Sequence, residues 1–182
     1  MRKSKTRLKP KFWLIMATFV ICGVLLWVGS QNGKETPKMD ECMASVERNT
    51  AEKDYYLDIP LPYVLQEELY EATQEFGVDY YVMIALIDRE SKFKNVMGDG
   101  GNSYGYCQIQ PKWWYGLMVE IGATDLNVPK DNFRVACAIM AKLTAKHQSI
   151  EGALVEYNQG SYKGNSTPYS REIIENAARY KA

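Results

Sequence analysis

The chain has 182 residues, and its 22 lysine and arginine side chains balance its 22 aspartate and glutamate side chains. With 46% hydrophobic and 12% aromatic residues it is too apolar for a disordered protein, and its length suits one folded domain with appendages. The charges are unevenly distributed along the chain. Residues 1–30 hold six basic side chains and no acidic one, and residues 31–182 hold the other 16 basic and all 22 acidic side chains. The acidic balance of this larger part argues against nucleic acid as a partner.

The basic N-terminal segment precedes an apolar one. Residues 1–11 carry the six basic groups, and residues 12–29 contain no charged residue. As a helix, residues 12–29 would measure about 27 Å, close to the ~30 Å hydrocarbon core of a bilayer. Because positive charges favour the cytoplasmic side, the sequence predicts a single-pass transmembrane anchor with a cytoplasmic basic flank, and places the remaining chain on the extracytoplasmic side of the cell membrane.

A cleaved signal peptide is the alternative to this anchor, since Val28-Gly29-Ser30 is a tolerable cleavage site. The apolar core of a signal peptide usually spans ~7–15 residues, which is shorter than residues 12–29, so we favour an anchor or an uncleaved signal. Residues 30–57 are polar and weakly periodic and are interpreted as a stalk, which leads to a compact domain at residues 58–182.

The hydrophobic pattern of this domain predicts a mainly α-helical fold with a small β element. Apolar positions at helical spacing predict one helix at about residues 63–76, ending at Gly77, and a second at about 80–90, capped by Asp79. A glycine-rich loop follows, and then a strand-like segment at residues 103–110. Three or four further helices are expected at about residues 112–121, 131–147, 150–158 and 169–181.

The cysteines, at positions 22, 42, 107 and 137, show neither a CxxC motif nor a histidine at metal-ligand spacing. We therefore expect no metal site and no cofactor. Cys107 and Cys137 both lie in apolar segments and are interpreted as core residues, while a disulfide between them stays open. The lone His147 is interpreted as a helix-end residue without a catalytic role.

Glu90 departs from the pattern of its helix. The residues three, four and seven positions before it share its helical face and are all apolar: Ile87, Leu86 and Met83. A carboxyl group on an apolar face is desolvated, which raises its pKa and suits it to general acid catalysis near neutral pH. The competing interpretation is a glutamate at a helix end whose head lies in solvent or pairs with a neighbouring basic residue.

Four motifs, in order, resemble the lysozyme-like catalytic domain of lytic transglycosylases, a domain class that also includes goose-type lysozyme. ALIDRESKF at residues 85–93 resembles a helix-ending Glu-Ser-x-Phe signature, and SYGYCQIQP at residues 103–111 resembles a Gly-x-x-Gln segment followed by proline. ALVEYNQG at residues 153–160 is similar to an Ala-Tyr-Asn-x-Gly element, and PYSREII at residues 168–174 resembles a closing helix with a tyrosine. The resemblance covers about residues 62–180 and implies an α+β lysozyme-like fold.

The resemblance also implies functional roles. Glu90 matches the catalytic acid/base of the family. Roles in supporting that carboxyl group or binding substrate are implied for Ser91, Ser103, Gln108, Tyr157, Asn158 and Tyr169. Three positions depart from the family pattern, namely Tyr106 for leucine, Cys107 for methionine, and Glu156 where a small residue is common.

Aromatic residues near these motifs offer surfaces that suit sugar rings, although most buried aromatic residues are simply core. We expect about two of the following six to contact glycan: Tyr104, Tyr106, Trp113, Trp114, Tyr115 and Tyr162.

The implied reaction is cleavage of the β-1,4 bond between N-acetylmuramic acid and N-acetylglucosamine in peptidoglycan, without water and with a 1,6-anhydro product, for wall remodelling or lysis. Two alternatives stay open. If Asp99 positions a water molecule, the same site would act as a hydrolytic muramidase. The second alternative is that the domain is catalytically idle and serves as a glycan-binding scaffold of a wall-spanning apparatus, such as secretion or conjugation machinery.

Overall fold

The computed structural model describes residues 54–182. The expected basic flank, the expected anchor and residues 30–53 of the expected stalk lie outside the described residues. No helix within the described range is long and apolar enough to cross a membrane. Tyr55 and Leu57, which fall in the expected stalk, pack against the core of the domain.

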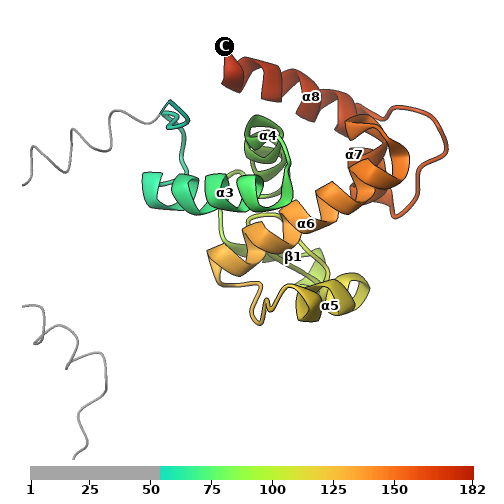
Figure 1. The fold of residues 1–182 in the computed structure, drawn as a ribbon, viewed down its shortest axis with the longest axis horizontal. Coiled ribbons are helices and arrows are strands. Elements are labelled where there is room, and N and C mark those ends of the chain that lie inside the picture. Colours follow the sequence, from blue (N-terminus) through green and yellow to red (C-terminus); the bar gives the residue numbers. More distant parts are fainter. Residues whose placement is uncertain (1–53) are drawn as a thin grey trace, which may run out of the picture. The chain divides into compact units, whose positions relative to one another are not determined.

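The described part of the chain is mainly helical with one small antiparallel sheet (Figure 1). The helices are α3 (Tyr63–Phe76), α4 (Tyr80–Ser91), α5 (Pro111–Glu120), α6 (Pro129–His147), α7 (Ile150–Gln159) and α8 (Pro168–Lys181). A hairpin between α4 and α5 consists of β1 (Val96–Gly98), the short 3-10 turn η1 (Asp99–Gly101) and β2 (Ser103–Gly105). In the sheet Val96 pairs with Gly105, and Gly98 pairs with Ser103.

Local signals in the sequence set the helix ends. The Asp79 side chain accepts hydrogen bonds from the backbone N–H groups of Tyr81 (2.8 Å) and Val82 (3.0 Å), as predicted for a cap of α4. Gly77 adopts a left-handed conformation with φ 66° and ends α3 at the predicted residue. All six helices lie within a few residues of their predicted positions.

The core is built around α4, in which residues 83–87 are fully buried. Helix α8 packs against α4, while α6 packs against both α3 and α7 (Figure 1). These contacts bring the end of α4 next to the start of α8, although the two are far apart in the sequence. The apolar stripe predicted beneath Glu90 is therefore part of the core.

The β element differs from the prediction in two ways. Part of the expected glycine-rich loop forms β1, and the expected strand at residues 103–110 ends at Gly105. The chain turns back after Gly105 (φ 77°), so that Ile109 forms a bridge with Tyr104. Gln108 lies in this turn with φ 50°. Residue alternation predicts an extended segment here, but positive φ angles at two positions bend it.

Asn132 on α6 fixes the hairpin to the helical part of the domain. Its Oδ1 accepts from the backbone N–H of Cys107 at 2.9 Å, and its Nδ2 donates to the carbonyls of Tyr104 (2.9 Å) and Leu126 (3.0 Å). The side chain is fully buried, so these bonds satisfy polar groups that have no access to water. Cys107 and Cys137 are buried core residues with free thiols, and burial raises the pKa of both.

Gly105 is predicted to be essential for this attachment. A Cβ atom at Gly105 would lie 2.2 Å from Nδ2 of Asn132 and 2.6 Å from the carbonyl oxygen of Leu126. Gly105→Ala should therefore destabilise the protein by about 2–4 kcal/mol, through strain at positive φ and overpacking. In the matched control Gly116→Ala, within α5, the added Cβ meets nothing within 4 Å, and stability should rise by about 0.5–1 kcal/mol. Urea unfolding followed by circular dichroism measures both, and equal midpoints would contradict this account.

Candidate active site

A cavity of about 660 Å³ opens between the hairpin and the helices α4 to α7. Such a volume suits a small ligand or a few sugar rings. Its lining combines carboxyl, amide and aromatic side chains: Glu90, Asp99, Ser103, Gln108, Ile109, Gln110, Trp113, Trp114, Ile139, Glu156, Tyr157, Asn158, Gln159 and Gly160.

Glu90 lies in the last turn of α4 at the wall of this cavity. Its side chain is partly buried above the core, and burial raises the pKa of its carboxyl group because the charged form loses solvation. The hydrogen bond from Tyr169 and the charge of Arg89 act in the opposite direction, but the pKa stays above its ordinary value. Glu90 is therefore a carboxyl group suited to holding a proton while facing a ligand.

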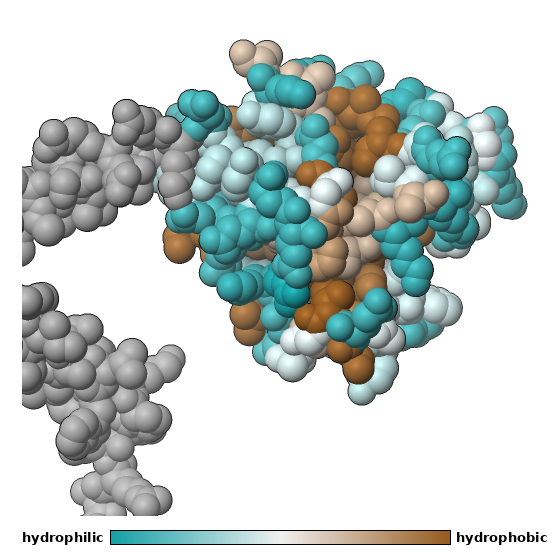
Figure 2. All heavy atoms as spheres, in the orientation of Figure 1, coloured by the Kyte–Doolittle hydropathy of each residue, from teal (hydrophilic) through white to brown (hydrophobic). Residues whose placement is uncertain are grey.

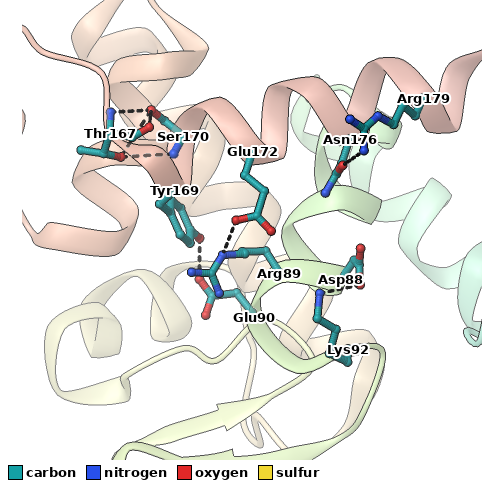
Figure 3. A network of polar contacts seen from close by, with 10 residues as sticks. All are labelled: Asp88, Arg89, Glu90, Lys92, Thr167, Tyr169, Ser170, Glu172, Asn176 and Arg179. Atoms are coloured by element: carbon teal, nitrogen blue, oxygen red, sulfur yellow. Dashed lines mark hydrogen bonds and ion pairs between the residues drawn. The ribbon is translucent and has the colours of Figure 1, made fainter.

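Tyr169 reaches Glu90 from the first turn of α8, and its hydroxyl group donates to Oε1 of the carboxyl group (Figure 3). Tyr169 is buried, and burial together with the nearby carboxylate raises the pKa of its phenol, which therefore remains a donor. The Arg89 guanidinium lies 5.5 Å from the centre of the Tyr169 ring, and its Nε is 3.0 Å from the Glu172 carboxylate. Residues of α4 and α8 thus surround the acid from one side.

Gln108 also lines the cavity, but the hairpin holds its amide group. Its Nε2 donates to the carbonyls of Val96 (3.0 Å) and Gly105 (2.8 Å). A Cβ atom on Gly98 would lie 2.0 Å from the Gln108 amide oxygen, so the absence of a side chain at Gly98 makes room for this arrangement. Both N–H groups are used within the protein, which leaves the amide oxygen as the group with capacity for a ligand.

The other expected site residues lie at different depths. Tyr157 lines the cavity, and its hydroxyl group donates to the carbonyl of Cys107 at 2.7 Å. Asn158 is exposed near the end of α7, and Ser103 is buried at the cavity wall. Ser91 does not line the cavity. Its hydroxyl group donates to the carbonyl of Ile87 at 3.2 Å and so belongs to the end of its own helix.

Gln110 also lines the cavity, although no motif in the sequence distinguishes it as a site residue. Its Nε2 donates to Oδ2 of Asp99 (2.9 Å) and to Oγ of Ser103 (3.3 Å), and its Oε1 accepts from the indole N–H of Trp113 (3.2 Å). It therefore connects η1, β2 and α5. Its position two residues after Gln108 is the only local signal, since no pattern distinguishes it from other polar residues before a proline.

Glu156, where the family commonly has a small residue, forms an anionic part of the lining. Its carboxylate accepts from Lys146 Nζ at 2.7 Å and contacts His147 Nε2 at 2.5 Å. The hydrogen bond from Lys146 is the main reason that the pKa of Glu156 is lowered. His147 is the last residue of α6, as predicted for a helix end. Within residues 54–182, no group of three or more His, Cys, Asp or Glu side chains is arranged to hold a metal ion.

A partly buried, protonatable carboxyl group in a cavity with amide and aromatic walls is typical of domains that cleave glycans. Residues 68–172 match the family described as the transglycosylase SLT domain, which is more than half of the chain. The chain therefore belongs to this family of lytic transglycosylase domains.

A solved structure also resembles the chain. It is an inactive mutant of the lytic transglycosylase Slt from Pseudomonas aeruginosa, with a TM-score of 0.57 and 18% sequence identity. The match covers 72% of this chain and 26% of that one, so the present chain corresponds to about a quarter of the larger protein. At this identity the likeness supports the shared fold. Among curated proteins, none matches the chain significantly.

The hydrogen bond from Tyr169 predicts a measurable shift at Glu90. Tyr169→Phe removes a donor that stabilises the carboxylate, so the pKa of Glu90 should rise above its already raised value. The ¹³C NMR titration of the Glu90 carboxyl carbon should then move to higher pH. Tyr180→Phe on the same helix is the control, because the Tyr180 hydroxyl group donates to Asp88 (3.1 Å) instead. An unchanged or lower midpoint in Tyr169→Phe would contradict the assigned role of this bond.

Proposed function

We propose that this domain cleaves the β-1,4 bond between N-acetylmuramic acid and N-acetylglucosamine in peptidoglycan, and that it closes a 1,6-anhydro ring instead of adding water. The observation that supports this proposal most strongly is the carboxyl group of Glu90, which has a raised pKa and lines a cavity together with amide and aromatic side chains. Family membership supports peptidoglycan as the substrate class.

In the proposed reaction, protonated Glu90 donates its proton to the glycosidic oxygen while the bond from that oxygen to C1 breaks. The acetamido oxygen of N-acetylmuramic acid stabilises the positive charge that develops at C1. The Glu90 carboxylate then accepts the proton of the C6 hydroxyl group as the C6 oxygen bonds to C1. Tyr169 and Arg89 stabilise the carboxylate between these steps, and Glu90 ends the cycle protonated as it began.

The surroundings of the other two carboxyl groups in the lining support a single-carboxylate reaction. Ordinary glycosidases use two carboxyl groups about 5–9.5 Å apart, one of which attacks or activates water. Glu156 is engaged by Lys146 and His147, and Asp99 accepts a hydrogen bond from Gln110. A substrate that supplies its own nucleophile needs neither of them.

Replacement of the acid tests the proposal. Glu90→Gln keeps the size of the side chain but removes the transferable proton, and release of muropeptides from purified peptidoglycan should fall at least ~10²-fold. Glu71→Gln, an exposed position on α3, is the matched control and should retain full activity. Mass spectrometry of the products should show anhydro ends. Full activity in Glu90→Gln would disprove the assignment, and a wild-type chain that binds peptidoglycan without cleaving it would favour the idle scaffold.

A hydrolytic muramidase is the second candidate function, and the observation that favours it is the presence of Asp99 in the same cavity lining as Glu90. Asp99→Asn distinguishes the two reactions. Asp99 has φ 48°, a conformation that asparagine adopts readily, and an amide oxygen can still accept from Gln110. A transglycosylase should keep forming anhydro ends in this variant. Reducing ends that appear with the wild type and are lost in Asp99→Asn would instead establish the muramidase.

We also propose that residues 12–29 anchor the protein in the cell membrane with the domain on the extracytoplasmic side, where a wall-spanning secretion or conjugation apparatus could use local wall opening. The apolar run and its basic flank support this proposal. We expect the full-length chain in the membrane fraction, and we expect protease added to intact spheroplasts to remove the domain. A shorter, freely secreted product would indicate a cleaved signal peptide.

A further inference from the structure

Trp113 is unusual among the large apolar side chains of the domain. It lines the same cavity as Glu90, yet it is 67% exposed. It lies in the first turn of α5, and Figure 2 shows apolar residues at the molecular surface over this helix, at the lower edge of the view. The neighbouring Trp114 packs against the core and Met118 is buried, so α5 already has its core anchors. Core packing therefore does not account for Trp113.

The indole of Trp113 is held in position despite its exposure. Its Nε1–H donates to Oε1 of Gln110 at 3.2 Å, and Gln110 is itself bound to Asp99 and Ser103. The Lys112 ammonium lies 4.3 Å from the centre of the ring and covers one face. An aromatic ring with a fixed edge and one covered face offers its other face to a ligand at little cost in side-chain entropy.

The shape and chemistry of this surface suit a sugar. The face of a pyranose ring carries C–H groups that pack on an aromatic plane, while its edge carries hydroxyl and acetamido groups. Polar groups that such an edge requires lie beside Trp113 in the same lining, on Gln110 and Asp99. Gln110 and Asp99 also hydrogen bond to each other, and an ionised carboxylate can accept further bonds from sugar hydroxyl groups.

We propose that Trp113 binds glycan by stacking on an N-acetylated pyranose of the strand, at the α5 end of the cavity. This inference rests on the proposed function for the identity of the strand, and it makes Trp113 a determinant of substrate affinity. Gln110 acts as a positioning residue, because it fixes the indole relative to the wall that also holds Asp99.

The test uses the full-length Glu90→Gln chain in detergent, so that binding is measured without cleavage, and a β-1,4-linked tetramer of N-acetylglucosamine as the probe. Adding Trp113→Ala should weaken the affinity about 2- to 10-fold by calorimetry, the range that aromatic contacts provide. Trp113→Phe keeps a stacking surface and should recover most of the loss. Saturation-transfer NMR should show contact with the sugar ring protons that decreases in Trp113→Ala.

Tyr115→Ala is the matched control, because Tyr115 is 69% exposed on the same helix but does not line the cavity. It should leave the affinity unchanged. The proposal is overturned if Trp113→Ala binds as tightly as its parent, if Tyr115→Ala loses as much, or if the parent does not bind the tetramer. Equal losses in both variants would indicate a general disturbance of α5 instead of stacking by Trp113. Peptidoglycan cleavage by the chain with intact Glu90 is measured in a separate assay. A chain that binds the tetramer through Trp113 but does not cleave peptidoglycan would contradict the proposed function alone, and a chain that cleaves without a contribution from Trp113 would contradict this inference alone.

Discussion

The hydrogen bond from Tyr169 to Glu90 joins the two regions that the site requires, the end of α4 and the start of α8. A carboxyl group above an apolar core is unfavourable in its charged form, and a neutral donor offsets part of that cost without neutralising the acid. An arginine in direct contact would have lowered the pKa of Glu90 and kept its carboxyl group deprotonated. Arg89 instead lies over the Tyr169 ring and pairs with Glu172, which keeps its positive charge near Glu90 but outside hydrogen-bonding contact. The packing of α8 on α4 is therefore a condition for the proposed chemistry as well as for the core.

The opposite wall is built from a short hairpin that could not be rigid alone. Two strands of three residues each are too small for independent stability. Asn132 fixes the hairpin segment to α6 through the backbone of Tyr104 and Cys107, and Gln110 fixes it to α5 through side chains. The cavity therefore has one wall made by helix packing and another held in place by side-chain amides.

Much of the helical scaffold was predictable from the sequence, because its signals are local. Asp79 and Gly77 mark helix ends through bonds to residues a few positions away, and the stripe beneath Glu90 follows from helical spacing. The contacts of Gln108, Gln110 and Ser91 were not predictable in this way. Whether an amide side chain faces a ligand or its own backbone depends on the positive φ angles that bend the hairpin. The alternation of apolar and polar residues in the sequence does not indicate these angles. Likewise, no sequence signal separates the exposed Trp113 from the packed Trp114 beside it.

The raised pKa of Glu90 also links the chemistry of the domain to its stability. A group whose pKa is higher in the folded state contributes stability below its unfolded-state pKa and loses that contribution as the pH rises through the folded value. Glu75, Asp131 and Glu156 behave in the opposite sense, because their pKa values are lowered and their contribution disappears in acid. Protonated Glu90 is thus both the form that can donate and the form that favours the fold. Alkaline conditions therefore remove the proposed catalytic proton and folding free energy through the same ionisation, whereas acid removes the contributions of Glu75, Asp131 and Glu156.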